Sequence, residues 1–259
     1  MGGDFFAMTR ERFAFGGSLD FNSKFRDYFE TRAVDTYVTY KPFASSRFFI
    51  SSDYRKKFAI DSRIYVEEYF DTDYAYYGLS IEPRFRFSDR FNMVYEFDFG
   101  LQKERPSFVN KVDDNIIFGI RDQKTVENSI RANYNFNTKQ GLSLSARQFW
   151  STASFGDNSY LNLIEDGELE ATNYDTSTFR DPDANFNIWN LDLSYRWQFA
   201  PGSEAVLLYR NSIFNEDKLS ELNYSDSLDN LFSKPARHNL SLRVVYFIDY
   251  NNLRNIFRS

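Results

Sequence analysis

Two kinds of side chain in this sequence have types and spacing that suit chemistry on a polar solute. They are regularly spaced charges and aromatic rings interleaved with them. The charges lie in segments in which polar and apolar residues alternate, on the odd or even numbers that carry the polar residues (the polar parity). They are Arg131, Arg147, Arg196, Arg243, Glu96, Asp98 and Asp192. Rings of charged side chains orient polar solutes inside pores. The simpler interpretation is that these charges pair across neighbouring strands and fill a water-facing interior.

Aromatic rings that share the polar parity are candidates for stacking on a sugar. They are Tyr37, Phe49, Tyr65 and Tyr76. Most other rings lie on the opposite parity near segment ends, where they suit the aromatic girdles that sit at headgroup depth in membrane proteins. A sugar-binding track is therefore the narrower hypothesis, and interfacial girdles are the broader one.

Catalytic and metal-binding patterns are absent from the sequence. With no Cys and one His, a thiolate metal site and a thiol nucleophile are excluded. No nucleophile elbow, zinc-protease motif or phosphate-binding loop occurs. The acidic segment 165–183 offers the oxygen ligands that calcium prefers, but its spacing matches no EF-hand, so an acidic solvated loop is expected. We expect no enzyme activity, no cofactor and no metal.

The composition narrows the class of protein further. The 259 residues are 19% aromatic, with 29 Phe and 18 Tyr, yet the mean hydropathy is −0.56. No long apolar run occurs, which excludes helical membrane spans of about 20 residues. A net charge of −6 argues against a nucleic-acid partner. A transmembrane β-barrel combines all these properties, because lipid-facing and lumen-facing residues alternate along each strand.

Period-two alternation is the strongest structural signal. In 91–101 and in 189–199 every odd position is apolar, and the even positions are polar apart from Val94 and Gly100. No helix produces this pattern. A soluble β-sandwich is the alternative, but the apolar parity here is very rich in Phe, Tyr and Trp while the other parity carries charges on nearly every strand.

The pattern predicts ten strands in a single domain over 1–259. They lie near 11–22, 31–41, 46–69, 74–88, 91–104, 115–136, 141–152, 186–199, 203–214 and 237–250. Parity is unbroken within 46–69 and 115–136, so each is interpreted as one long strand. Tight and longer connections alternate, which predicts long external loops near 105–114, 153–185 and 215–236. The last of these also predicts a short amphipathic helix on the barrel rim. The expected fold is an all-β, antiparallel, up-and-down transmembrane barrel.

Several segments together resemble one family. They are SSDYRKKF at 51–58, RDQKTV at 121–126 with RANYNFN at 131–137, YRWQFAPGSE at 195–204, and NLSL at 239–242 followed by YFIDY at 246–250. The set is similar to outer-membrane proteins of unknown function that join an N-terminal carbohydrate-binding-like module, related to binding-module family nine, to a large C-terminal barrel. The resemblance implies an outer-membrane location and the closing part of a larger barrel.

These observations lead to two functional hypotheses. The first is a bacterial outer-membrane barrel that passes or gates small polar solutes or oligosaccharides. The second is a non-conducting barrel that anchors a carbohydrate-binding module at the membrane. A surface hydrolase is a weaker third hypothesis. Outer-membrane lipid is the expected partner, together with small polar solutes or oligosaccharides, and the sequence does not identify a protein partner. The start of the chain contains no secretory signal, so a mature product or part of a longer chain is expected.

Overall fold

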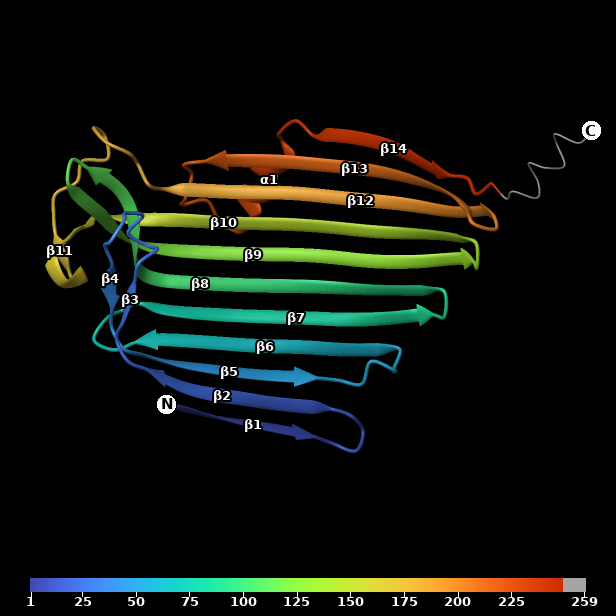
Figure 1. Ribbon diagram of the computed structural model, residues 1–259, viewed down its shortest axis with the longest axis horizontal. Coiled ribbons are helices and arrows are strands. Elements are labelled where there is room, and N and C mark those ends of the chain that lie inside the picture. Colours follow the sequence, from blue (N-terminus) through green and yellow to red (C-terminus); the bar gives the residue numbers. More distant parts are fainter. Residues whose placement is uncertain (249–259) are drawn as a thin grey trace, which may run out of the picture.

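The protein is built mainly from one antiparallel sheet, seen in a computed structural model that describes residues 1–248 (Figure 1). Its strands run in the order β1 (Gly2–Met8), β2 (Ala14–Asn22), β5 (Phe43–Ser51), β6 (Phe58–Tyr69), β7 (Ala75–Ser88), β8 (Phe91–Val112), β9 (Asn115–Asn137), β10 (Gln140–Leu163), β12 (Ala184–Ala200), β13 (Ser203–Asp217) and β14 (Arg237–Val245). The prediction of an all-β, up-and-down antiparallel sheet is confirmed. Within the described residues β1 and β14 do not pair with each other, so the sheet is open there.

The register sorts side chains onto two chemically different faces. Directly opposite residues share a face, and Asp98 of β8 lies opposite both Ser80 of β7 and Glu127 of β9. We call this side the charged face. The other side, the apolar face, carries exposed rings and aliphatic side chains on most strands, including Phe48 and Ile64. Alternation therefore forms strands whose two faces suit different surroundings.

The segment 46–69 folds as a hairpin, so the single-strand interpretation was wrong. β5 ends at Ser51 and β6 begins at Phe58, with Ser46 paired to Val66. The turn is held by Asp53, which accepts hydrogen bonds from the backbone N–H and guanidinium of Arg55. These bonds hold the pKa of the Asp53 carboxyl well below its usual range. The direct partners Ser51 and Asp61 are separated by an even number of positions, so both strands keep the same parity, and alternation alone missed the reversal.

Other boundaries also differ from expectation. The region 31–41 contributes only β4 (Val38–Tyr40), which pairs with β3 (Phe25–Asp27) outside the main sheet, and β1 was not anticipated. The expected loop 105–114 is mostly strand, because β8 and β9 continue as one long hairpin. In 153–185, β10 extends to Leu163 and pairs with β11 (Leu169–Ala171). Residues 249 and 250 of the last predicted strand lie outside the described residues.

Residues 23–42, which we call the rim segment, leave the main sheet between β2 and β5. Their strands β3 and β4 run across the ends of the main strands rather than along them (Figure 1). The segment is fixed by a buried cluster that joins it to β6 and β9: Val38, Tyr40, Tyr69, Tyr74, Ile116 and Phe118. Burial of these apolar groups is the main force that holds it against the long-loop ends.

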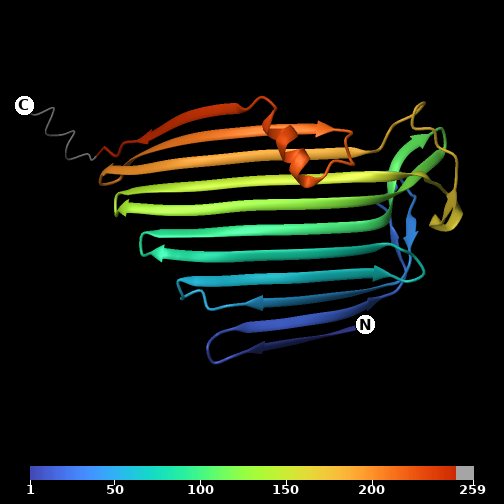
Figure 2. The same cartoon turned by 180° about the vertical axis from the view of Figure 1, so that it is seen from behind.

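The predicted amphipathic helix exists, but it does not lie on the rim. Helix α1 (Tyr224–Phe232) begins after Asn223, whose side chain accepts the Asp226 N–H. It packs on the apolar face over β12 and β13 (Figure 2). There it covers a row of polar side chains, and the Asn187 amide donates to the Ser227 carbonyl at 2.9 Å. The apolar face thus becomes polar toward the long-loop ends.

A cross-linking test distinguishes the β5–β6 hairpin from one continuous strand. In the chain, which has no native Cys, Ser46→Cys with Val66→Cys should form a disulfide because the two residues are direct partners. In one extended strand they would lie about 66 Å apart, at about 3.3 Å per residue.

The matched control is Ser46→Cys with Glu67→Cys, since Glu67 faces the opposite side of the sheet. Non-reducing electrophoresis and mass spectrometry of tryptic peptides measure both pairs. Equal cross-linking of the two pairs, or none in the first, would contradict the hairpin.

Candidate functional site

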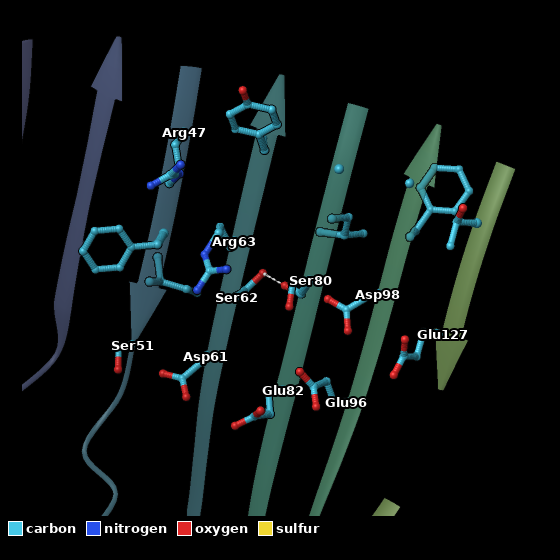
Figure 3. A pocket seen from close by; sticks show the side chains of 18 of the residues that line it. Arg47, Ser51, Asp61, Ser62, Arg63, Ser80, Glu82, Glu96, Asp98 and Glu127 are labelled. Atoms are coloured by element: carbon cyan, nitrogen blue, oxygen red, sulfur yellow. Dashed lines mark hydrogen bonds between the residues drawn. The ribbon is translucent and has the colours of Figure 1, made fainter. Parts of the chain in front are cut away.

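The charged face is hollowed between β5 and β9, and this hollow is the candidate site (Figure 3). Its volume is about 1200 Å³, and it is open on the side away from the sheet. Its wall consists mainly of side chains of one parity from five neighbouring strands, among them Arg47, Arg63, Ser80, Asp98 and Glu127. Tyr54 of the β5–β6 turn also lines it, so the hollow is chiefly a product of the register.

Two glycines deepen the hollow where the wall would otherwise be filled. Gly78 and Gly100 are direct partners across β7 and β8. A Cβ at either position would lie 3.2 Å from the Tyr76 ring or its hydroxyl, so the ring lies flat over the glycine pair. This is the close-approach use of glycine in a strand.

Three of the four candidate sugar-stacking rings meet in the hollow. Phe49, Tyr65 and Tyr76 all line it, and the Tyr65 and Tyr76 ring centroids are 5.6 Å apart. Tyr37 lies elsewhere, in the rim segment, with the Arg26 guanidinium 4.4 Å from its ring. The structure thus groups three rings and separates the fourth.

The predicted charged residues share one face, but they do not form one cluster. Glu96 and Asp98 line the hollow, while Arg131 and Arg147 lie beside it on β9 and β10. Arg131 pairs with Glu96 at 3.3 Å, and Arg147 donates to Glu127 at 2.7 Å. Both arginines therefore neutralise neighbouring carboxylates across strands.

The remaining predicted charges lie farther along the same face. Asp192 of β12 accepts from Arg210 at 3.2 Å, and Arg243 of β14 donates to Glu204 at 2.7 Å. Arg196 faces the same way near the tight-turn end of β12 and is exposed. These three are distant in strand order from the hollow between β5 and β9.

Sequence reasoning did not single out Arg47 and Arg63, which line the hollow on β5 and β6. Both lie on the polar parity of 46–69, so alternation carried the signal for them. Alternation did not reveal the hairpin, and only the hairpin pairing brings these arginines next to the rings. Arg47 lies opposite Tyr65, and Arg63 lies opposite Phe49. The Arg47 guanidinium lies 5.8 Å from the Tyr65 ring centroid, a cation–π arrangement.

In the acidic segment 165–183, two carboxylates accept hydrogen bonds from neighbouring groups of the protein. Asp175 accepts from the Ser177 and Thr178 hydroxyls, and these bonds lower its pKa to about 2. Asp183 accepts from the Ser220 hydroxyl. Among the side chains that the structure describes, no group of three or more from His, Cys, Asp or Glu is arranged to hold a metal ion.

No helix within residues 1–248 has the length and apolar character needed to cross a membrane.

A family model described as domain of unknown function DUF5916 matches residues 1–257, so the chain belongs to this family. Neither the comparison with curated proteins nor the comparison with solved structures found a match. Membership of a family of unknown function, which the resemblance implied, is confirmed.

The ion pairs of the hollow predict a salt-dependent contribution to stability. Arg84 contacts both Asp61, at 3.4 Å, and Glu82, and these two carboxylates are direct partners across β6 and β7. Arg84→Gln leaves like charges opposite each other, so the free energy of unfolding should fall by about 1 kcal/mol. Denaturant titration followed by fluorescence measures the change, and 1 M salt should largely abolish it.

Arg10→Gln is the control, because it removes the same charge at the exposed turn between β1 and β2, where the Arg10 side chain forms no ion pair with any described residue. We expect it to leave the stability unchanged. If Arg84→Gln is equally neutral at low salt, the carboxylates of the hollow do not depend on Arg84.

Proposed function

We propose that this member of the DUF5916 family is the wall of a bacterial outer-membrane β-barrel whose charged face lines a polar lumen for small polar solutes or oligosaccharides. The observation that carries the proposal is that the two faces of one sheet differ in chemistry. One surface carries exposed rings and aliphatic side chains on most strands, and the other is charged and hollowed. A sheet between lipid and water needs both surfaces.

The dimensions of the apolar face support the proposal. On β12 that face runs through Trp189, Leu191, Leu193, Tyr195, Trp197 and Phe199. These ten residue steps span about 33 Å along the strand at about 3.3 Å each. A tilt of about 40° reduces this to a layer of about 25 Å, the height of the apolar band in outer-membrane barrels.

The ends of this band also fit a membrane. Trp197 and Phe199 lie at the tight-turn end, with ring centroids 5.7 Å apart, and suit an interfacial girdle. At the other end, Asn187 and Gln148 are hydrogen-bonded under α1. The helix therefore would lie outside the lipid layer, where amides are not penalised.

A second candidate function is a non-conducting barrel that anchors a carbohydrate-binding module. The rim segment favours it, because this segment packs across the long-loop ends of the strands through a buried cluster. Such a segment would narrow or close a lumen. We expect neither candidate to have hydrolytic activity, because the sequence contains no constellation that would supply a nucleophile and its base.

Quenching by brominated lipid tests the membrane orientation of the apolar face. Trp150→Phe with Trp189→Phe leaves Trp197, which is 44% exposed, as the one tryptophan. We expect strong quenching of Trp197 in liposomes of acyl-chain-brominated phosphatidylcholine, because its ring would contact the acyl chains.

The control retains Trp150, which is 3% exposed and packs against Tyr224 of α1. Trp189→Phe with Trp197→Phe provides this variant, and we expect weak quenching. If Trp197 is quenched no more than Trp150, the apolar face does not contact lipid.

Planar-bilayer recording separates the two candidate functions. A conducting lumen predicts discrete openings, whereas an anchoring barrel predicts none. If openings occur, Arg147→Glu with Arg196→Glu should shift the ion preference toward cations, because both side chains would face the lumen. Arg55→Glu at the tight turn is the control, and a selectivity unchanged in the double variant would assign the arginines a structural role.

A further inference from the structure

Two arginines face each other at the long-loop end of the hollow. Arg105 of β8 and Arg121 of β9 are direct partners. The row before them is Gln102 opposite Gln123, and both glutamines line the hollow. Arg121 is two residues from Gln123 on an unbroken strand, so it shares the charged face. Like charges opposite each other destabilise a strand pair, yet the fold places them together.

A bulge in β8 creates this arrangement. Between Gln102 and Arg105 β8 advances by three residues, while β9 advances by two from Gln123 to Arg121. Glu104 adopts the left-handed conformation, with φ of 51°, and its N–H donates to the Asp122 carboxylate at 2.9 Å. Regular alternation would have turned Arg105 to the apolar face. Bulges commonly re-aim a side chain next to a functional site.

The arginine pair is incompletely neutralised. Glu30 of the rim segment lies 3.4 Å from the Arg105 guanidinium, but it also accepts the Phe108 N–H at 3.1 Å. The Nε atoms of Arg105 and Arg121 are buried and have no hydrogen-bond partner among the described residues. Burial, with the charge of Arg105, lowers the pKa of Arg121. Buried donors without acceptors are costly and are usually satisfied by a further group.

We propose that Arg105 and Arg121 bind the anionic group of an acidic sugar held in the hollow. Two guanidinium forks suit the planar oxygens of a carboxylate and also accept a sulfate. A stacking surface for a pyranose lies farther along the same face, where Tyr76 is the direct partner of Gln102 and its ring centroid is 5.6 Å from that of Tyr65. This inference names the class of solute for the proposed lumen, and to that extent it rests on the proposed function. The binding of an acidic sugar by the two arginines does not itself require a lumen.

Calorimetric titration of the purified full-length chain in detergent tests the site. The probes are D-glucuronate, inorganic sulfate and D-glucose at constant ionic strength. We expect saturable binding of glucuronate, weaker binding of sulfate and none of glucose. Arg121→Gln should weaken glucuronate binding about tenfold or more, the usual value of a charge-assisted bond. Arg55→Gln, the same charge change at the tight turn, should have no effect.

Glu30→Gln distinguishes binding from a purely structural role. Because this variant removes the carboxylate that competes for Arg105, glucuronate affinity should rise several-fold, whereas a structural role predicts a fall. Circular dichroism checks that each variant is folded, and Arg121→Lys, which retains the charge but not the fork, should bind with intermediate affinity.

Three results would overturn the inference. They are no saturable glucuronate binding, equal binding by Arg121→Gln and Arg55→Gln, or weaker binding by a folded Glu30→Gln. Sulfate bound as tightly as glucuronate would overturn the acidic-sugar assignment. The titration needs no bilayer, so a silent bilayer recording and a failed titration are separate outcomes.

Discussion

The pairing register is the constraint on which the rest of this structure depends. A slip of one residue in any strand would carry all its charges to the apolar face. Instead, polar residues lie opposite polar residues across the whole sheet, from Asp4 and Ser18 at one edge to Arg210 and Asn239 at the other. The hollow, its ion pairs and the field of rings behind it are all consequences of that single alignment. Where the register changes, at the β8 bulge, a new charged pair joins the same face.

The hollow combines groups that are individually ordinary in a water-facing wall. Among the arginines that line it, Arg84 is paired with Asp61 on the next strand, and beside it Arg131 is paired with Glu96. Such pairs fix side-chain positions without leaving strong net charge at one point. The paired glycines let the Tyr76 ring lie close against the strands, and the rings of Phe49, Tyr65 and Tyr76 line the hollow. A wall of this kind offers a solute hydrogen bonds and stacking surfaces along one direction.

Alternation along the chain was enough to predict the class of sheet and the face of most charges. It failed where local patterns do not record geometry. The turn between Ser51 and Phe58 preserves parity, so the hairpin is invisible to a parity argument. Arg105 was beyond its reach for the opposite reason, because the bulge changes parity within the strand.

Long-range packing was the other limit of the sequence. The face on which α1 lies depends on partners far away in the chain, such as Asn128, whose amide donates to Tyr224 at 2.8 Å. The position of the rim segment likewise depends on β6 and β9. Neither arrangement leaves a local pattern in 23–42 or 224–232. Short-range alternation and turn chemistry thus account for the sheet but not for the two elements that pack against it.

The rim segment imposes an order on folding. Most strand pairs of the main sheet join neighbours in the chain, so the sheet can grow hairpin by hairpin with low loop-closure cost. Val38 and Tyr40, by contrast, pack against Ile116 and Phe118, which are paired with β8 in the β8–β9 hairpin. We therefore expect a segment near the start of the chain to dock after the middle strands have assembled. Its attachment marks completion of the central sheet, and a chain stalled before that point would expose the buried cluster to chaperones and proteases.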